Sequence, residues 1–552
     1  MVMMNRSLKL AFLAWVGSLL IVPIVRAQLT DQSQTTPSIP GGVIAKSLEE
    51  QVGAGHADDR TFGSAVYLIE RDPARAIRRG RQLFQRKFTQ AQGVGPRVDK
   101  DSSGDIRAVR ALGAGLADSC AGCHARPRGA AGFGGDVVTR PDSRDAPHLF
   151  GLGLQEMLAQ EITADLRAIR DDAVRQATSA AGTNDTSRRC KRSPDLCTGS
   201  PATRPLTSKG IAFGWITAYP DGSVDASRVE GVDADLRVRP FFAQGGTISI
   251  REFIVGAFKA EMGLEAPDAI LCDATDPVAP RRRVSPAGFV FDPEQDRFER
   301  PPVCDVSEDG DGDGVRNEVD TAVVDYMEFY LLNYFKPGLG RQTIRTRTGR
   351  HLLDRVGCTR CHVEELVIDQ DRRVADVQTV HDPVHGIFNR LFATATTQFA
   401  VVEDGDRYPR LEPKGEPFVV ENIFTDFKRH DLGEAFHERE YDGTLQTEFL
   451  TEPLWGVGST APYGHDGRSI DLEEVILRHG GEALRSRNAY AALPEADQRL
   501  IVEFLESLVL FPPDDTASNL NPGDPDGDPQ QPANHGSINL GALFQIPEEG
   551  PE

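Results

Sequence analysis

The sequence repeats one five-residue motif, Cys-x-x-Cys-His, at two positions far apart in the chain. The first copy is Cys120-Ala121-Gly122-Cys123-His124 and the second is Cys358-Thr359-Arg360-Cys361-His362. In this motif the two thiols form thioether bonds to a haem, and the histidine binds the iron as its proximal ligand. Sulfur atoms at positions i and i+3 share one face of a helical turn, where both can reach the same porphyrin. The chain is therefore predicted to carry two covalently bound haem c groups.

A zinc site or a redox dithiol is the alternative interpretation of two cysteines at this spacing. Neither chemistry explains why a histidine directly follows the second cysteine in both copies. We therefore expect haem binding by Cys120, Cys123, His124, Cys358, Cys361 and His362.

The first residues are typical of an exported protein. Arg6 and Lys9 precede an apolar run that ends near Val25, and Ala27 closes a Val-Arg-Ala sequence suited to cleavage. Residues 1–27 are thus a predicted signal peptide, which indicates a periplasmic or secreted location. The run is slightly short for a membrane span and contains Pro23, so an uncleaved anchor is the alternative. No membrane span is expected after cleavage.

Four cysteines lie outside the haem motifs, and an even number is expected to pair in an oxidising compartment. Pairing the cysteines that are nearest in the sequence joins Cys190 to Cys197 and Cys272 to Cys304. The sequence alone allows three connectivities.

The chain is strongly acidic. Its formal net charge is −22, and removal of Arg6, Lys9 and Arg26 with the signal peptide makes it −25. Such a charge excludes nucleic acid as a partner and favours a cationic one, such as a basic electron-transfer cytochrome. Ordinary solubility of an exported protein is the other explanation of this charge.

The two motifs divide the chain into predicted domains, because a mature chain of about 525 residues is too long for a single core. Helical spacing surrounds each motif, so we expect a mainly α fold with two cytochrome c-like haem domains. A long, partly irregular insertion rich in Pro, Asp and Arg would separate them. The predicted boundaries are a polar leader at 28–46, a first haem domain at 47–179, an insertion at 180–336, a second haem domain at 337–512 and a flexible tail at 513–552.

The predicted insertion contains a pattern typical of a calcium-binding loop. Oxygen ligands recur at loop positions 1, 3, 5, 9 and 12, Gly314 stands at position 6, and position 7 offers a backbone carbonyl. A solvated acidic turn is the alternative. The expected calcium ligands are Asp309, Asp311, Asp313, Val315, Asn317 and Asp320.

Several further segments resemble the bacterial di-haem oxidoreductases, a family related to di-haem cytochrome c peroxidases and to the enzyme that matures methylamine dehydrogenase. The resemblance covers about residues 75–510, although Leu450-Thr451 replaces a usual arginine and the insertion is unusually long. The similar segments are Arg144–Leu154, Phe213-Gly214-Trp215, His430–Gly433, Thr451–Gly456, Ala461–Arg468, Leu472-Glu473-Glu474 and His479–Ala483.

This resemblance implies roles for individual residues. His479 stands at the end of a predicted short helix, at the position that supplies the sixth ligand of the C-terminal haem in relatives. A capping or surface role is its alternative. The family similarity also implies that Glu156 is the acid–base group at the first haem, that Trp215 is an aromatic ring between the haems, and that His465 orients a loop near the propionates. His148 could instead close the first site, and either tryptophan could simply be core.

Three functions compete at this point. The leading prediction is an exported di-haem oxidoreductase that is peroxidase-like, with one haem relaying electrons and the other reacting with peroxide or another small-molecule oxidant. The second is a non-catalytic di-haem electron carrier. The third is a haem oxygenase that acts on a hydrophobic or polymeric substrate.

Overall fold

The fold is a mixture of helices and small sheets. The computed structural model describes residues 47–94, 117–124, 144–179, 199–310, 314–333, 337–381, 391–403, 405, 409–440, 442–510, 520–521 and 538–539. It is 38% helical and 17% strand. The prediction of a mainly α, cytochrome-like fold is therefore wrong. Many of the strands are only two to four residues long and too short to show an alternating pattern, but the strands at 202–208, 211–218, 375–381 and 391–397 have seven or eight residues and were also not predicted.

Helices near the N-terminus pack around one fully buried helix. They are α2 (Leu48–Val52), α3 (Ala65–Arg71) and α4 (Pro73–Gln85). Of these, α3 and α4 pack on α10 (Thr321–Leu332), whose twelve residues are all buried. Asp72 caps α4, and Pro73 occupies its first turn. Gly80 allows close contact of α4 with α10, because a Cβ there would lie 2.0 Å from the carbonyl oxygen of Tyr326. Part of the predicted insertion thus contributes to this core, while the domain boundaries stay a prediction.

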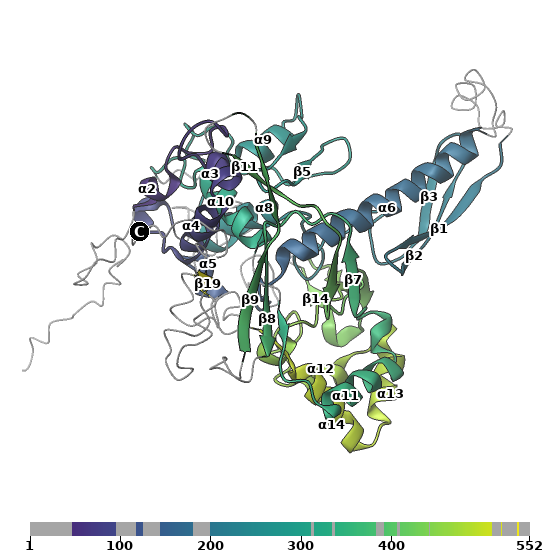
Figure 1. The fold of residues 1–552 in the computed structure, drawn as a ribbon. Helices are drawn as coiled ribbons and strands as arrows, with labels where there is room; N and C mark the ends of the chain where they lie inside the picture. The colour runs from purple at the N-terminus through teal and green to yellow at the C-terminus, as the bar shows by residue number, and fades with distance from the viewer. Residues whose placement is uncertain are drawn as a thin grey trace, which may run out of the picture.

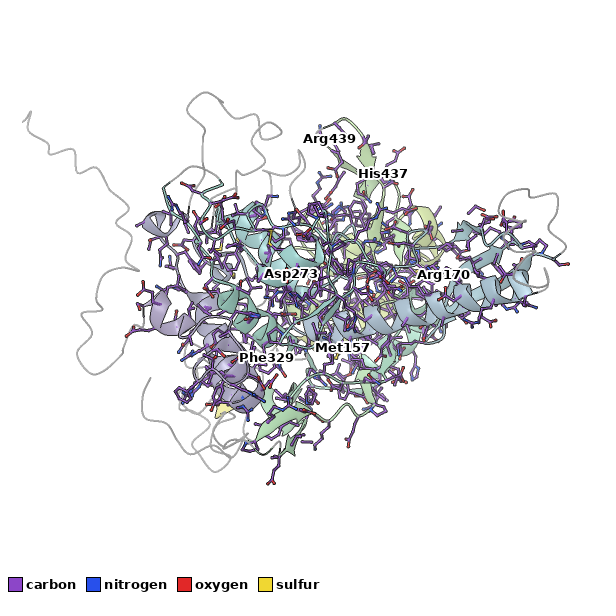
Figure 2. All side chains as sticks on the ribbon, turned by 90° about the horizontal axis from the view of Figure 1, so that it is seen from above. Met157, Arg170, Asp273, Phe329, His437 and Arg439 are labelled. Atoms are coloured by element: carbon purple, nitrogen blue, oxygen red, sulfur yellow. A yellow bond between two sulfur atoms is a disulfide. The ribbon has the colours of Figure 1, made fainter. Side chains whose placement is uncertain are left out.

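A 28-residue helix, α6 (Leu152–Ser179), begins in the core and leaves the body of the molecule (Figure 1). Its outer half carries the antiparallel sheet β1 (Ala202–Ser208), β2 (Ile211–Ala218) and β3 (Val224–Val229). Small alanines form the contact between helix and sheet. In Figure 2, Met157 lies over the body, whereas Arg170 lies farther along α6 toward the projecting end. The contact alanines are Ala173, Ala177, Ala202 and Ala218.

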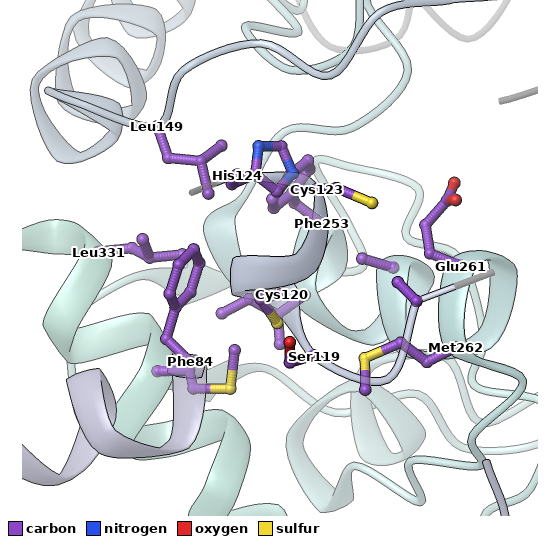
Figure 3. A pocket seen from close by; sticks show the side chains of 14 residues that line it. Phe84, Ser119, Cys120, Cys123, His124, Leu149, Phe253, Glu261, Met262 and Leu331 are labelled. Atoms are coloured by element: carbon purple, nitrogen blue, oxygen red, sulfur yellow. The ribbon is translucent and has the colours of Figure 1, made fainter. Parts of the chain in front are cut away.

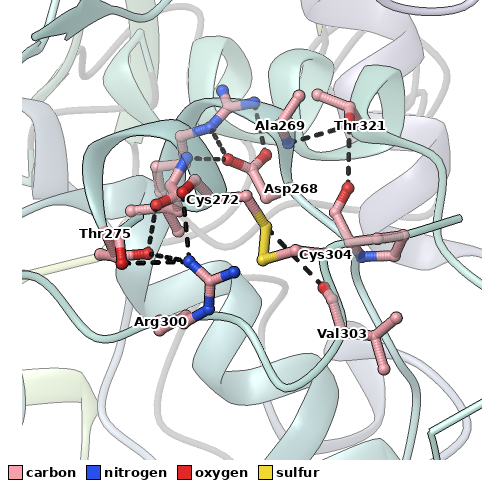
Figure 4. Close-up of a disulfide and its surroundings, with 11 residues drawn as sticks. Asp268, Ala269, Cys272, Thr275, Arg300, Val303, Cys304 and Thr321 are labelled. Carbon is pink, nitrogen blue, oxygen red and sulfur yellow. Dashed lines mark hydrogen bonds and ion pairs between the residues drawn. A yellow bond between two sulfur atoms is a disulfide. The ribbon is translucent and has the colours of Figure 1, made fainter. Parts of the chain in front are cut away.

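The segment after this sheet folds back into the core and is crosslinked. It contains α8 (Ile250–Ala257), a π-helical turn (Phe258–Met262), α9 (Ala269–Ala274), β4 (Arg283–Val284) and β5 (Val290–Phe291). A disulfide joins Cys272 to Cys304, with 5.7 Å between the Cα atoms (Figure 4). This is one of the two pairs expected from the sequence. The other pair, Cys190 and Cys197, lies outside the described residues.

The C-terminal helices form a second, smaller core. In it α11 (Ile344–Arg355) packs on α14 (Glu495–Glu506), and α12 (Leu472–Arg478) and α13 (Leu484–Ala491) lie beside them. The apolar stripe of α14 faces inward, with Ile501, Phe504 and Leu505 buried. Gly349 lets α11 approach, since a Cβ there would lie 1.9 Å from the carbonyl oxygen of Leu500.

Short antiparallel ribbons connect these helical parts. The pairs are β7 (Glu365–Ile368) with β12 (Phe418–Glu421), β8 (Ala375–His381) with β9 (Leu391–Thr397), β10 (Phe399–Val402) with β11 (Arg410–Pro413), β13 (Arg429–Asp431) with β16 (Glu448–Leu450), β14 (Glu438–Arg439) with β15 (Leu445–Gln446), β6 (Gly338–Leu339) with β17 (Leu508–Val509), and β18 (Leu520–Asn521) with β19 (Ile538–Asn539). Single 3-10 turns are Gln90–Gln92, Cys358–Arg360, Glu434–Phe436, Val457–Ser459 and Gly481–Ala483.

The predicted signal peptide and leader lie outside the described residues, as does most of the predicted tail. Within the part of the chain that the structure describes, no helix combines the length and the apolar character that a membrane crossing requires.

Candidate haem sites

The first Cys-x-x-Cys-His motif forms one short helix at the edge of an apolar cavity. The helix α5 (Cys120–Cys123) closes with the His124 amide donating to the Cys120 carbonyl at 3.0 Å. The cavity is small, about 40 Å³, and partly open to solvent (Figure 3). Apolar walls, two free thiols and an imidazole are the donor set and surroundings that a covalently attached haem requires. The lining includes Phe84, Cys120, Cys123, His124, Leu149, Phe253, Ile254, Glu261, Met262, Met327 and Leu331.

The His124 ring is oriented for iron binding by its backbone partner. Its Nδ1 lies 2.7 Å from the carbonyl oxygen of Pro147 and donates to it, so that Nε2 carries no proton. Burial is the main cause that lowers the pKa of His124 to about 4, although the bond to Pro147 opposes it. The ring is therefore neutral at pH 7, and its Nε2 lone pair is free to bind a metal.

The four cysteines of the two motifs are free. Burial raises the pKa of Cys120 to about 12 and that of Cys358 to about 11. Among the described residues, a group whose ligand atoms could share one ion joins Cys361 to Asp426 and His430, and it takes in no other residue of either motif.

In that group, both ring nitrogens of His430 contact carboxylates. Its Nε2 lies 2.9 Å from Asp426 Oδ2 and its Nδ1 lies 2.8 Å from Glu482 Oε2. Burial lowers the pKa of His430, but the bonds to Asp426 and to Cys361 outweigh burial and raise it to about 11. A charged imidazolium between two carboxylates has no lone pair to offer a metal ion.

The second motif has the same backbone anchor as the first. It begins after Gly357, whose φ of +88° requires glycine, and His362 Nδ1 donates to the Phe424 carbonyl at 3.0 Å. Burial is the main cause that lowers the pKa of His362 to about 4, and His479 acts in the same direction. The rings of His362 and His479 are therefore close enough to influence each other.

His479 ends α12, and two side-chain contacts fix its ring. Its Nδ1 donates to the Val475 carbonyl at 2.7 Å, and its ring packs edge-on against Phe436. The neighbouring Arg478 forms an ion pair with Asp466. These contacts leave Nε2 of His479 available, as a sixth ligand requires. His362 and His479 thus both use Nδ1 on a backbone carbonyl and keep Nε2 for a ligand role.

His465 lies in a polar cluster rather than at an iron position. Its ring stacks on Phe449 with 3.9 Å between centroids, and its Nε2 lies 3.1 Å from Glu438. Glu438 also binds Arg144 through Nε and Nη2. Burial raises the pKa of Glu438, but hydrogen bonds from His465 and Arg144 outweigh burial and lower it to about 2.

Glu156 is buried and occupied by protein partners. Only 1% of its surface is exposed. Oε2 accepts a hydrogen bond from the Ile250 amide at 2.7 Å, and Oε1 accepts one from Arg372 at 2.6 Å. Glu156 is not among the residues that line the cavity at Cys120. The carboxylate that does line it is Glu261, which the sequence analysis missed because a π-helical turn leaves no recognisable pattern.

The two tryptophans of the described chain have different surroundings. Trp215 lies on β2, 42% exposed, with Arg228 5.6 Å from its ring. Trp455 is 2% exposed, and its ring packs so closely on Gly151 that a Cβ there would lie 2.6 Å from it. Its carbonyl oxygen lies 3.1 Å from His148 Nε2.

The predicted calcium loop is only partly described, since Asp311 and Asp313 lie outside the described residues. Asp309 Oδ2 accepts a hydrogen bond from the Gly314 amide at 2.9 Å, which closes the turn. Gly314 has a φ of +93°, as the sixth position of such a loop requires. Asp320 caps α10 by accepting from the Ala322 amide at 2.8 Å.

Comparison with known proteins gives remote structural matches and a family match over part of the chain. No curated protein matches the chain. Among solved structures, Kuenenia stuttgartiensis hydrazine synthase pressurised with 20 bar xenon matches at 15% identity with a TM-score of 0.20. That match covers 34% of this chain and 55% of the other, about half its length, and it is too remote to carry an argument.

The family described as "Di-haem oxidoreductase, putative peroxidase" matches residues 372–508. His430, His465 and His479 lie within the matched segment, whereas both Cys-x-x-Cys-His motifs precede it. The match agrees with the resemblance found in the sequence, and it shows that residues 372–508 are similar to the di-haem oxidoreductases.

Proposed function

We propose that this protein is an exported di-haem c-type oxidoreductase that passes electrons through its second haem and reacts with peroxide or another small oxidant at its first. The observation that carries the proposal is the repeated arrangement at the two motifs. In each, a half-buried, neutral histidine donates Nδ1–H to a backbone carbonyl and presents Nε2 beside two cysteines. When bound, the haems supply the redox-active iron.

The proposed iron ligands differ between the two sites. His362 and His479 would hold the second iron from both sides, which leaves no place for a substrate oxygen there. At the first site, His124 would hold the iron from one side. His148 follows Pro147, which binds the Nδ1 edge of His124, and its own Nε2 is bonded to Trp455. Because Nε2 of His148 is used on Trp455, we propose that His148 does not close the first site, where the oxidant would react.

The acid–base group proposed for the first site is Glu156, and the proposed aromatic relay is Trp215. Both carboxylate oxygens of Glu156 already accept hydrogen bonds, from the Ile250 amide and from Arg372. To accept a proton from the substrate, Glu156 would have to break one of these two bonds. The exposed edge of Trp215 suits contact with an electron partner, for which the net charge of −22 favours a cationic cytochrome.

We also propose that the loop from Asp309 to Asp320 binds calcium as a structural ion. The Gly314 turn and the helix that starts at Thr321 support this proposal, because a calcium loop commonly leads directly into a helix.

Intact mass and EPR spectroscopy of the purified protein test this function. Two covalent haems add two haem masses to the polypeptide, and a mass without them refutes the proposal. The expected EPR spectrum is mixed, with a high-spin signal from the His124 haem and a low-spin signal from the His362/His479 haem. A wholly low-spin protein that is inert to peroxide, oxidised or half-reduced, would instead be an electron carrier.

A further inference from the structure

The two proximal histidines are connected to each other through the protein, not only to their own sites. His124 donates to the Pro147 carbonyl at 2.7 Å, and His362 donates to the Phe424 carbonyl at 3.0 Å. The residue after Pro147 is His148, and the residue before Phe424 is Ile423. Each histidine is thus held by a backbone carbonyl, and a residue next to that carbonyl in the chain makes a further hydrogen bond.

One side chain and one backbone bond close the distance between these anchors. His148 Nε2 lies 3.1 Å from the Trp455 carbonyl oxygen, and the Leu454 amide donates to the Ile423 carbonyl at 3.0 Å. Leu454 and Trp455 are consecutive. A continuous run of hydrogen bonds and peptide-linked neighbours thus joins the two rings, in the order His124, Pro147, His148, Trp455, Leu454, Ile423, Phe424 and His362.

This run, which we call the proximal link, is buried at the end nearest the second motif. Ile423 and Phe424 are fully buried there, and Trp455 is 2% exposed. Two backbone hydrogen bonds to the segment after the second motif hold this end: the Ile423 amide donates to the Glu364 carbonyl and the Thr425 amide donates to the Val363 carbonyl, each at 3.1 Å. Hydrogen bonds in such a buried place are stronger than in water.

The protonation of His148 suits its place in the link. A carbonyl oxygen only accepts hydrogen bonds, so the proton of the neutral ring must be on Nε2. Burial is the main cause that lowers the pKa of His148 to about 4, so the ring stays neutral. Its Nδ1 has no hydrogen-bond partner among the described residues, so its placement depends on the Trp455 bond and on packing.

We propose that the proximal link couples the two haem sites and that His148 is the positioning residue that closes it. The inference rests on the proposed function, because it requires two haems. When one electron passes from the second haem to the first, the second iron is oxidised and the first is reduced. Bonds and hydrogen bonds transmit a tunnelling electron better than gaps do. A change of charge at either iron also alters the Nδ1–H bond of its histidine, and the link carries that change to the other ring.

Three variants of the full-length di-haem protein test the link. His148→Leu removes the donor and keeps an apolar side chain, whereas His148→Gln can still donate to Trp455. Trp455→Phe is the matched control, because the link uses the carbonyl of this residue and not its indole ring. The measurement is the rate of electron transfer between the haems after rapid reduction of the second one.

We expect His148→Leu to slow this transfer by about tenfold or more, with His148→Gln partly restoring it and Trp455→Phe leaving it nearly unchanged. An unchanged rate in His148→Leu with full haem content overturns the proposal. A slow rate in Trp455→Phe alone also overturns it, because the indole ring would then be the relay.

A measurement on the unmodified protein keeps the proposal testable if His148→Leu does not fold. Reduction of the second haem should change the EPR signal of the first, and an identical signal in both states contradicts coupling. Haem content and peroxide turnover are measured separately, so a failure of the proposed function is distinguished from a failure of the link.

Discussion

At the scale of single residues, the ring nitrogen that each histidine uses for the protein determines what remains for a metal. His124, His362 and His479 all use Nδ1 on a backbone carbonyl and keep Nε2 free. His430 uses both nitrogens on carboxylates. The sequence distinguishes His124 and His362 by motif and His479 by resemblance, and the structure adds the hydrogen bonds that set His430 apart from them.

His479→Gly should convert the second haem from low spin to high spin and leave both haems attached. The reason is that attachment depends on the thioethers, whereas spin state depends on the sixth ligand. EPR spectra and intact mass measure the two effects separately. His437→Gln is the control, since His437 contacts Asp431 at 2.9 Å in the same region. A low-spin signal that persists in His479→Gly would show that another residue is the sixth ligand.

Glu156→Gln separates a catalytic from a structural role for this carboxylate. If Glu156 is the acid–base group, peroxide turnover should fall by roughly 10² to 10⁴ while both haem spectra stay nearly intact. If it only holds Arg372 and the Ile250 amide, the melting temperature should fall and the turnover per haem should be retained. Glu161→Gln is the matched control on the same helix, because Glu161 pairs with Lys209 near the surface.

At the scale of elements, sequence patterns succeeded where one face of a helix is apolar and failed where burial is complete or strands are short. The stripe of α14 was visible because its other face is charged. The buried helix α10 has no polar face, so its place beside α4 could not be inferred from periodicity. The ribbons β13–β16 and β14–β15 are two or three residues long, which is too short for an alternating pattern.

In the candidate site, too, some residues could be predicted from the sequence and others could not. Both haem motifs and His479 could be proposed from spacing and resemblance, because the chemistry fixes the residue types. The partners Pro147, Phe424 and Val475 bind through backbone carbonyls, which any residue possesses. No sequence pattern identifies them, and the proximal link could not have been predicted.

Calcium should stabilise the protein through the loop that leads into α10. Chelation, or Asp309→Ala, should lower the melting temperature and increase proteolysis near the loop, because an ion that binds only the folded state stabilises it. Haem content should not change. Asp305→Ala is the control, since Asp305 makes a similar turn outside the loop by accepting from Ser307 at 2.9 Å. Equal melting temperatures with and without calcium would contradict the proposal.

At the scale of the whole molecule, segments distant in the sequence close around each other. The segment after Arg144 holds the first proximal histidine, and it is in turn held by C-terminal residues. The Asp145 amide donates to the His465 carbonyl at 3.0 Å, and Arg144 binds Glu438. The family segment 372–508 therefore completes the surroundings of the first haem motif, which lies more than two hundred residues earlier.

The contact between Arg144 and the C-terminal residues should depend on pH, because Glu438 must be ionised to form it. Burial opposes ionisation, but the bonds from His465 and Arg144 lower the pKa of this carboxyl from 4.5 to about 2. A carboxyl whose pKa is lower in the folded state contributes stability above its unfolded pKa and loses it as the pH falls toward its folded pKa. The Glu438 contribution should therefore be complete above pH 4.5 and disappear progressively toward pH 2.

Melting temperatures measured from pH 7 to pH 2 test this expectation. Glu438→Gln should melt at a lower temperature than the unmodified protein at pH 7, and the difference should shrink between about pH 4.5 and pH 2, because the unmodified protein then loses the same charge. Glu448→Gln, which changes an exposed carboxylate on β16, should show neither effect. A constant difference between Glu438→Gln and the unmodified protein across this range would mean that the charge of Glu438 does not hold the segment after Arg144 against the C-terminal residues.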